Sequence, residues 1–430
     1  MIKKFLILSM ILVTFFSLTR AAMAAAQPLS EVQWARMLGD GTARCVQPTS
    51  DGGYLLTGWT KGQIGSGSDI FLFKVDELGN KTRGTVLKGN GYSCGFGVIE
   101  TSDGGAVVVG DTKSKTGVDH DVIVAKVDAS GSKVWERNFG GPYCDYGAAV
   151  VETADGGFLV AGGTESYGAG IYDAYLIRLN SEGQETWEKT YGGKGSDCAY
   201  ALIKKPEGGF TVAGNTDSTG SGKTRVYLFQ TDAEGGLLWE RQIGRSDDTY
   251  GWSLQPAADG GYLVAGETAV IGATGGGLKS YLVKTDSLGN PTWEKIYGAD
   301  SYSSAYALVQ AGEDNYILVG KKESADGVHD LYILKTAPLG ETLDERILTD
   351  LCGSCAYSAQ QTVDGAYVLA GEQISPVNGA KQVLLVKLTA DRADDLLAAT
   401  RLLIPAILIA SILLLAVYKR KLSKNNRSIG

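Results

Sequence analysis

A short glycine-rich motif returns seven times along this chain at a nearly constant interval. Asp-Gly-Gly or a close relative begins at Asp51, Asp103, Asp155, Glu207, Asp259, Glu313 and Asp364. The intervals between these positions are 52, 52, 52, 52, 54 and 51 residues. A fixed period of this length indicates one supersecondary unit repeated seven times, and it restricts the chain to repeat architectures.

The third unit, which runs from Gly147 to Gly193, shows what each repeat contains. Short apolar runs rich in Val, Leu, Ile, Tyr and Phe alternate with turn signals, and this pattern predicts four short strands per unit. We name these strands A to D in chain order. The Asp-Gly-Gly motif supplies the A–B turn, and segments such as Asp286–Asn290 supply the C–D turn, where Gly and Asn accept positive φ.

Seven units of four antiparallel strands predict an all-β, seven-bladed β-propeller over residues 27–390. A solenoid of the same units is the alternative. The chain ends favour the propeller, because residues 32–38 form an isolated D-type strand and residues 382–388 form a C-type strand with no D strand after it. The N-terminal strand can therefore complete the last blade and close the ring, which removes the exposed sheet edges of a solenoid.

Tryptophan recurs in one slot of strand D. The five examples are Trp34, Trp135, Trp187, Trp239 and Trp293. A repeated indole in an outer strand favours packing between adjacent blades over a ligand-binding ring. Arg83 and Asp344 stand where the pattern expects Trp, so two D strands depart from it.

The repeat also resembles a known group of propellers. The phrase T-x-D-G-G-[YF]-L-V-A-G-x-T, followed by D-x-Y-L-V-K-x-D-x-x-G-N-x-x-W-E-K-x-Y-G-G, is similar to the DGG-type β-propeller repeats of bacterial and archaeal secreted or cell-surface proteins. The resemblance covers nearly all of residues 32–390. It implies a propeller in an extracellular setting, with surface binding or adhesion as its loosely implied role.

The first residues have the three parts of a secretory signal peptide. A basic start at Lys3 and Lys4 precedes an apolar stretch from Phe5 to Leu18 and a run of small residues. We predict a signal peptide over residues 1–26, cleaved after Ala24 or Ala26. An uncleaved N-terminal anchor is the alternative.

A second apolar segment, residues 402–418, contains no charge and is followed by a basic tail over residues 419–430. Its length corresponds to about 25 Å of helix, the short end of the range that spans a bilayer. Because basic flanks remain cytoplasmic, we predict one transmembrane helix after a linker at 391–401, with the propeller on the outer surface of a prokaryotic cell. A buried core helix is the alternative. Processing by a sorting enzyme is not indicated, since no LPxTG-type motif precedes the helix.

Composition limits the partners. The formal net charge is −8, and both ends use up basic residues, so the exported part is acidic. An acidic surface disfavours nucleic acid as a partner. The expected partners are the membrane, through the C-terminal helix, and a glycan or a surface protein.

The connections of the unit predict where a ligand would bind. The A–B and C–D turns are short and fall on one face, which we call the short-turn face, whereas the B–C and D–A connections are longer and form the long-loop face. Varied loops on a rigid scaffold usually carry binding. The candidate binding residues on this face and on the channel rim are Tyr92, Tyr143, Asp145, Tyr146, Asp197, Asp248, Tyr250 and Tyr302.

Tyrosines and aspartates around a funnel suit sugars or cationic groups. The alternative is that these residues are polar loop residues that satisfy their own backbone. We predict no cofactor and no metal. Calcium lacks support because the chain has no D-x-[DN]-x-[DN]-G loop.

Six cysteines lie near the predicted channel rim. They are Cys45, Cys94, Cys144, Cys198, Cys352 and Cys355. In an exported protein an even number predicts disulfides, and adjacent blades suggest Cys45–Cys94 and Cys144–Cys198, with Cys352–Cys355 as a local pair. Redox catalysis at Cys352-Gly-Ser-Cys355 is less favoured, because such motifs normally open a helix and this one opens a strand.

No catalytic motif is recognisable. His120 and His329 each precede an Asp in separate units, and no triad, zinc motif or phosphate loop surrounds them. We therefore predict a non-enzymatic binding or adhesion module with an unknown ligand. The alternatives are a glycan-cleaving enzyme that uses carboxylates such as Asp197 and Asp248, and a purely structural surface protein.

Overall fold

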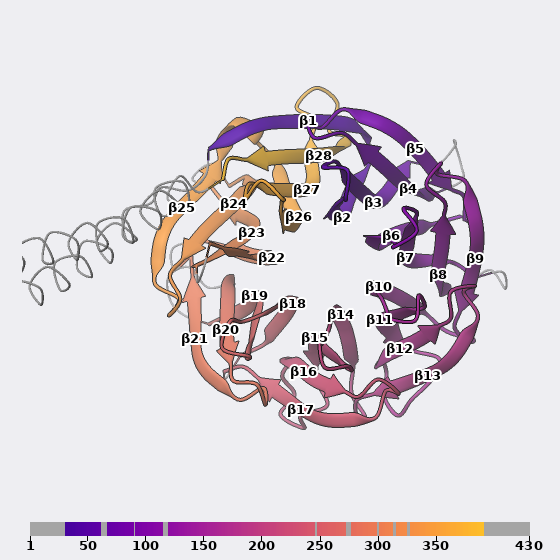
Figure 1. Ribbon diagram of the computed structural model, residues 1–430. Coiled ribbons are helices and arrows are strands. Elements are labelled where there is room, and N and C mark those ends of the chain that lie inside the picture. The colour runs from indigo at the N-terminus through magenta and orange to yellow at the C-terminus, as the bar shows by residue number, and fades with distance from the viewer. Residues whose placement is uncertain are drawn as a thin grey trace, which may run out of the picture. The chain divides into compact units, whose positions relative to one another are not determined.

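The computed structural model describes residues 31–390, except 62–66, 90, 115–118, 246, 272–276, 299–300, 313–314 and 325–326. In this part of the chain it contains seven four-stranded sheets arranged as blades around a central axis (Figure 1). In every blade the sheet follows chain order from the innermost to the outermost strand, apart from the last. The seven-bladed β-propeller predicted from the repeat is confirmed.

Each of the first four blades consists of four consecutive strands, ordered from the axis outward. Blade 1 contains β2 (Thr42–Pro48), β3 (Tyr54–Lys61), β4 (Ser68–Val75) and β5 (Lys81–Leu87). Blade 2 contains β6 (Ser93–Glu100), β7 (Ala106–Lys113), β8 (His120–Val127) and β9 (Lys133–Phe139). Blade 3 contains β10 (Asp145–Glu152), β11 (Phe158–Thr164), β12 (Asp173–Leu179) and β13 (Glu185–Tyr191). Blade 4 contains β14 (Asp197–Lys204), β15 (Phe210–Thr216), β16 (Arg225–Thr231) and β17 (Leu237–Ile243).

The remaining three blades follow the same order. Blade 5 contains β18 (Thr249–Pro256), β19 (Tyr262–Val270), β20 (Gly277–Thr285) and β21 (Pro291–Tyr297). Blade 6 contains β22 (Ser303–Ala311), β23 (Asn315–Glu323), β24 (His329–Thr336) and β25 (Thr342–Leu348), followed by the 3-10 turn η1 (Thr349–Leu351). Blade 7 contains β26 (Ser354–Gln361), β27 (Tyr367–Ile374), β28 (Lys381–Leu388) and β1 (Val32–Asp40).

The N-terminal strand β1 closes the ring by pairing antiparallel with β28, as the sequence predicts. Arg36 lies opposite Leu385, and Val32 lies opposite Leu388 at the short-turn end of the blade. The two ends of the propeller are tied there by a hydrogen bond from the Glu31 amide to Thr389 Oγ1, 3.0 Å long. Closure gives the outer edge of β28 a partner, and an unpaired edge would otherwise invite association with other chains.

The core lies between successive blades, because each sheet is covered on both faces by its neighbours. Between blades 2 and 3, for example, Val107 and Val122 of one blade pack with Phe158 and Tyr175 of the next, and all four are buried. The middle strands B and C are consequently buried along their length, whereas an outer D strand such as β13 is mostly exposed or half-buried. Burial of these faces against each other is the main favourable contribution to the fold.

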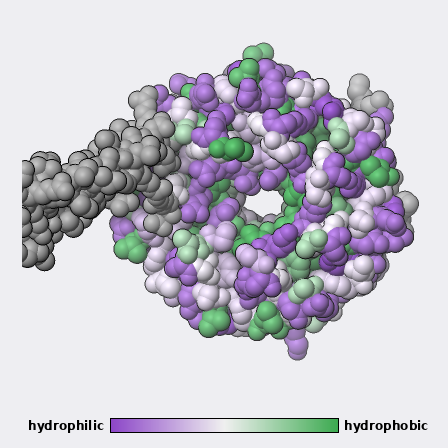
Figure 2. Space-filling model, viewed as in Figure 1, coloured by the Kyte–Doolittle hydropathy of each residue, from purple (hydrophilic) through white to green (hydrophobic). Residues whose placement is uncertain are grey.

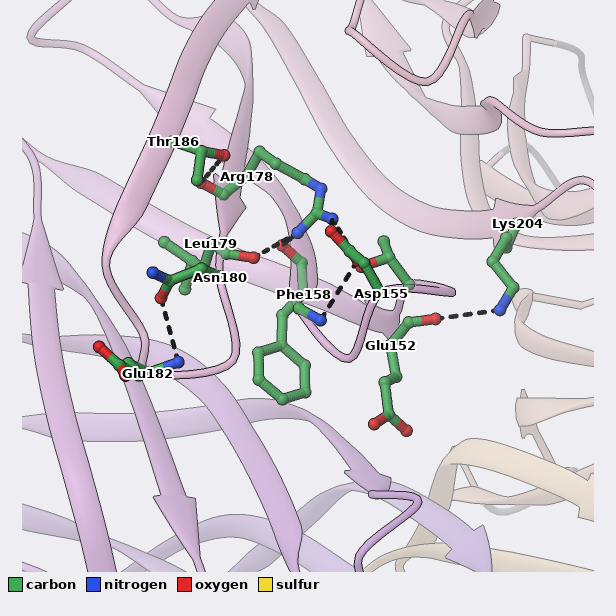
Figure 3. A network of polar contacts seen from close by, with 11 residues as sticks. Glu152, Asp155, Phe158, Arg178, Leu179, Asn180, Glu182, Thr186 and Lys204 are labelled. Atoms are coloured by element: carbon green, nitrogen blue, oxygen red, sulfur yellow. Dashed lines mark hydrogen bonds and ion pairs between the residues drawn. The ribbon is translucent and has the colours of Figure 1, made fainter.

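The aspartate of the Asp-Gly-Gly turn binds a basic residue in strand C of its own blade. Figure 3 shows this contact in blade 3, where Arg178 lies 2.6 and 2.7 Å from the two carboxylate oxygens of Asp155. The same pair recurs as Lys74–Asp51, Lys126–Asp103, Lys284–Asp259 and Lys387–Asp364. In blade 4 Gln230 replaces the cation, and Glu207 pairs with Lys205 instead. The contact orients the turn more than it stabilises the fold, because the carboxylates are largely exposed.

The repeated tryptophans pack between blades. Trp135 of blade 2 lies against Gly183 in the C–D turn of blade 3, where a Cβ would come within 2.8 Å of the indole. The equivalent pairs are Trp34–Gly79, Trp187–Gly235, Trp239–Gly289 and Trp293–Gly340. Each of these glycines has a positive φ. The turn conformation and the contact with the indole therefore both require glycine at this position. The predicted role of the tryptophans in packing agrees with these contacts.

The two exceptions to the tryptophan pattern differ in origin. At the junction of blades 1 and 2, Arg83 replaces Trp, its side chain lies against Gly131, and it donates a 2.5 Å hydrogen bond to the Ala129 carbonyl. A cavity of about 260 Å³ remains at this junction. Asp344 faces blade 7, where the two chain ends take the place of a C–D turn. No turn glycine is therefore present for an indole to cover.

The predicted signal peptide, linker, transmembrane helix and basic tail lie outside the described residues. Within residues 31–390, as far as they are described, no helix has the length and apolar character needed to cross a membrane.

Candidate functional site

The innermost strand of every blade carries a β-bulge at the same place. In blade 4 the pairing with β15 shifts between Ala199 and Ala201, so Tyr200 is the extra residue. Corresponding shifts in the other blades make the bulge residues Arg44, Phe96, Ala148, Trp252, Tyr306 and Tyr357. A bulge re-aims the extra side chain and leaves it out of the ladder. All seven are half-buried and together form the wall of the central channel.

The channel is a cavity of about 780 Å³. It is lined by all seven bulge residues. The other lining residues are Asp111, His120, Cys144, Asp145, Tyr146 and Tyr172. Figure 2 shows the open centre of the ring, with apolar residues on part of its wall. His120, Cys144 and Tyr172 lie at the long-loop ends of their blades, so the cavity reaches that face. Its volume falls within the range of small-molecule sites.

Aromatic rings form a continuous cluster on the side of blades 3 to 5. The rings of Tyr146 and Tyr200 stack at 6.1 Å between centroids, and Tyr200 meets the edge of Trp252 at 4.9 Å. Tyr172 lies 6.4 Å from Tyr146, and Tyr250 stacks parallel to Trp252 at 5.8 Å. The small residue Gly163 makes room for Tyr146, since a Cβ there would come within 2.8 Å of the ring. We call Tyr146, Tyr172, Tyr200 and Trp252 the aromatic arc.

The side of blades 6, 7 and 1 combines aromatic rings with basic groups. The Arg44 guanidinium lies over the ring of Tyr357, 4.2 Å from its centroid. Lys321 lies over Tyr302 and Tyr306, at 5.2 and 5.9 Å. Cation–π contacts of this kind hold the basic side chains against the wall. We call this side the basic arc.

The second strand of three blades carries a carboxylate near the channel, and one of these, Asp111, lines the cavity. Asp111 contacts His120 at 2.9 Å, and Glu372 accepts a 2.6 Å hydrogen bond from Thr42 and pairs with Lys381 at 2.9 Å. Glu267 lies beside Trp252 and Ser304. Burial raises the pKa of Asp111 and of Glu267, and the nearby His120 and Lys321 partly offset that effect. Burial likewise raises the pKa of Tyr146 well above its usual range.

Several buried polar atoms of this region lack a hydrogen-bond partner among the described residues. They are Arg44 Nε, Asp111 Oδ1, Tyr146 Oη, Trp252 Nε1 and Glu267 Oε2. Buried polar groups are normally satisfied, and those that are not call for a bound water or ligand. All of these residues except Glu267 line the cavity, whereas others of this kind, such as Asp197 Oδ1 and Thr231 Oγ1, lie elsewhere in the propeller. No group of three or more metal-binding side chains occurs in the described part of the chain.

Of the predicted site residues, the three aspartates organise loops. Asp145 is fully buried and accepts hydrogen bonds from the Gly141 amide and the Ser166 hydroxyl. Asp197 is equally buried and accepts from the Gly193 amide and from Ser218. The carboxylate of Asp248 accepts from the Thr224 amide, 2.8 Å away. These contacts match the alternative in which the aspartates satisfy their own backbone, although Asp145 also lines the cavity.

The five predicted tyrosines separate into two groups. Tyr146 lines the cavity, and Tyr250 and Tyr302 contact the wall through Trp252 and Lys321. Tyr92 and Tyr143 are instead exposed in D–A loops, at 64% and 54% of their surface. The structure therefore brings Asp145, Tyr146, Tyr250 and Tyr302 together around the channel and leaves Tyr92 and Tyr143 outside it.

The predicted disulfides are not formed, and all six cysteines are free thiols. Cys45 faces the Val98 carbonyl of blade 2, and Cys198 contacts Tyr146 and Tyr200. Cys355 is buried while Cys352 is exposed, so the side chains of this pair point to different surroundings. Equivalent positions on neighbouring blades thus bring the cysteines to one rim without bringing their sulfur atoms together.

The sequence interpretation missed the bulge residues, although a signal for them exists. Each stands seven residues before the first residue of its Asp-Gly-Gly motif. Five of these seven residues are aromatic: Phe96, Tyr200, Trp252, Tyr306 and Tyr357. The alternation of the strand alone does not reveal a bulge, so the direction of these side chains was not evident.

The sequence matches no described protein family. A stretch of 188 residues, 38% of this chain, is 27% identical to the regulatory protein FlaEY of Caulobacter vibrioides, and the match spans only 20% of that protein. Two solved structures show the fold. The WD40 domain of Pan2 from Neurospora crassa aligns with 83% of this chain and 97% of its own length at a TM-score of 0.52 and 11% identity.

A puromycin hydrolase aligns with 85% of this chain and 55% of its own length, with a TM-score of 0.50 and 15% identity. At these levels of identity the likeness shows the β-propeller fold alone.

Proposed function

We propose that this protein is a non-enzymatic binding or adhesion module, held at the outer face of a membrane, that takes its ligand into the central channel. The observation that supports this most is the cavity of about 780 Å³ with its aromatic wall. Flat aromatic faces and a few convergent polar groups are the usual lining of a ligand site. The repeat provides a rigid scaffold that holds one bulge residue on every blade, and five of these residues are aromatic.

The position of the chain ends supports the orientation in this proposal. β28 ends at Leu388, opposite Tyr367, which follows the A–B turn of blade 7. The chain therefore leaves the propeller on the short-turn face. A tether joined at this face, such as the predicted helix at 402–418, leaves the long-loop face and the channel mouth accessible to a ligand outside the cell.

No observation favours the alternative of a glycan-cleaving enzyme. Such an enzyme needs two carboxylates on either side of the scissile bond. Both carboxylates considered for this role already accept backbone hydrogen bonds, Asp197 from Gly193 of its own loop and Asp248 from Thr224 of the B–C loop of blade 4. The proposal accordingly contains no catalytic step, no cofactor and no metal.

A glycan array probed with the ectodomain, residues 27–395, tests the proposal. The variants Tyr200→Ala and Trp252→Ala remove channel rings, and Tyr92→Ala removes an exposed ring outside the channel as a matched control. We expect saturable binding that the channel variants abolish and the control retains. Binding that survives both channel variants would contradict the proposal, and an absence of binding to glycans and to surface proteins would favour a structural role.

A further inference from the structure

The two sides of the channel differ in whether their aromatic faces already have a cation. In the basic arc, Tyr302, Tyr306 and Tyr357 are covered by Lys321 or Arg44. Across the described residues, no lysine or arginine lies over any of the four rings of the aromatic arc. The rings of the aromatic arc therefore contact other rings but carry no basic side chain of the described residues, in contrast to the basic arc.

Negative charge accompanies the aromatic arc. Glu267 is 6% exposed, its carboxylate lies beside Trp252, and its Oε2 atom has no hydrogen-bond partner among the described residues. At the mouth, Glu165 lies next to Tyr172. The positive charge of Lys321 lowers the pKa of Glu267, but no ion pair joins the two side chains in the described structure. Ser304 and Trp252 contact the carboxylate, and burial still raises its pKa, so a bound cation would favour its charged form.

We propose that the aromatic arc binds an organic ammonium group, with Tyr146, Tyr172, Tyr200 and Trp252 around it and with the buried carboxylate of Glu267 beside Trp252. This inference rests on the proposed function, because it names the ligand class of the same channel. Rings that meet at different angles can surround a cation, and a quaternary or alkylammonium group is the ligand that such cages select.

The geometry favours an ammonium group over a neutral sugar at this position. Tyr146 and Tyr200 are nearly parallel, at 21°, whereas Tyr200 and Trp252 meet at 63° and Tyr146 and Tyr172 at 50°. The four rings therefore do not form the single flat platform that suits a sugar ring. A neutral ligand would also bring no positive charge to the buried carboxylate of Glu267. The small Ala148, the bulge residue of blade 3, leaves space beside this cluster where the other blades carry larger bulge side chains.

The test is isothermal titration of the full chain in a polyoxyethylene detergent with choline chloride. The neutral isostere 3,3-dimethylbutan-1-ol, which has the same shape without the charge, serves as the matched ligand. We expect choline to bind and the isostere to bind at least tenfold more weakly. Glu267→Gln preserves the side-chain shape and should weaken choline binding at least tenfold, whereas Tyr92→Ala, which removes an exposed ring outside the channel, should retain it.

Equal binding of choline and its isostere, or unchanged choline binding in Glu267→Gln, would overturn the inference. An absence of choline binding would overturn it as well. If glycans still bind and Trp252→Ala abolishes their binding, the proposed function stands and only the ammonium assignment fails. If choline, glycans and surface proteins all fail to bind, both fail together.

Discussion

The indole of Trp135 and the glycine at position 183 fit each other across the junction of blades 2 and 3. Gly183 has a φ of +74°, and a Cβ built on it would lie 2.8 Å from the Trp135 ring. The sequence repeats both residues together, one blade apart, because the turn conformation and the packing each require the absence of a side chain. This relationship makes the contribution of the junction measurable.

Replacing Gly183 by Ala should destabilise the propeller by about 2–4 kcal/mol, from the positive φ and the clash with Trp135 together. Gly156→Ala is the matched control, because Gly156 has a φ of +75° and no atom lies within 4 Å of its added Cβ. The control should cost about 1–2 kcal/mol, which is the backbone strain alone. Urea denaturation of both variants gives the difference. Equal destabilisation would show that the indole does not depend on this glycine.

The junction of blades 1 and 2 predicts the opposite effect. Arg83 occupies the tryptophan slot, and a cavity of about 260 Å³ remains there. Arg83→Trp places against Gly131 the residue found at five other junctions, and we expect it to raise the free energy of unfolding by about 1 kcal/mol. Arg83→Ala should lower it, because the aliphatic part of the arginine is lost. A destabilised Arg83→Trp variant would mean that this junction differs from the others in more than one residue.

Most of the fold could be predicted from the sequence, whereas most of the site could not. The period of the Asp-Gly-Gly motif determines the number of blades, and the lone D-type strand at the N-terminus determines how the ring closes. The bulges were not predictable in this way, because Tyr200 or Trp252 looks like any aromatic residue of a strand until the pairing register is known. The disulfide prediction differs from the structure for a related reason. Equal positions in the repeat do not fix the distance between side chains on different blades.

Acid should weaken the propeller through the turn aspartates. The Lys74 ammonium holds the pKa of Asp51 at about 2, and Lys126 does the same for Asp103. A carboxyl in an unfolded chain has a pKa of about 3.9, so these groups stabilise the folded state above pH 4. That contribution is lost as the pH falls from about 4 to about 2.

Denaturation midpoints measured from pH 5 to pH 2 test this expectation. The variant Asp103→Asn should show a shallower decline than the unaltered protein, and 0.5 M salt should reduce the difference because the pairs are exposed. An identical decline in the variant would mean that Asp103 is not linked to stability.

The thiols should differ in reactivity. Burial raises the pKa of Cys94 and of Cys355 to about 12, so both remain protonated and unreactive at pH 8. Cys352 is exposed and should be alkylated first. Iodoacetamide labelling of the native protein followed by non-reducing peptide mapping gives the order. Any Cys45–Cys94, Cys144–Cys198 or Cys352–Cys355 disulfide in the map would contradict the free thiols of the structure.

The claim that the central channel is the ligand site is tested most directly by 19F NMR of the protein labelled with 5-fluorotryptophan. The chain has seven tryptophans, and Trp252 is the one among the bulge residues, with a resonance that Trp252→Phe assigns. During titration with choline chloride, and then with the glycans of the array, the account predicts that the Trp252 resonance shifts while those of the five interblade tryptophans remain in place. A Trp252 resonance that stays fixed while a ligand binds, as shown by shifts elsewhere, would contradict it.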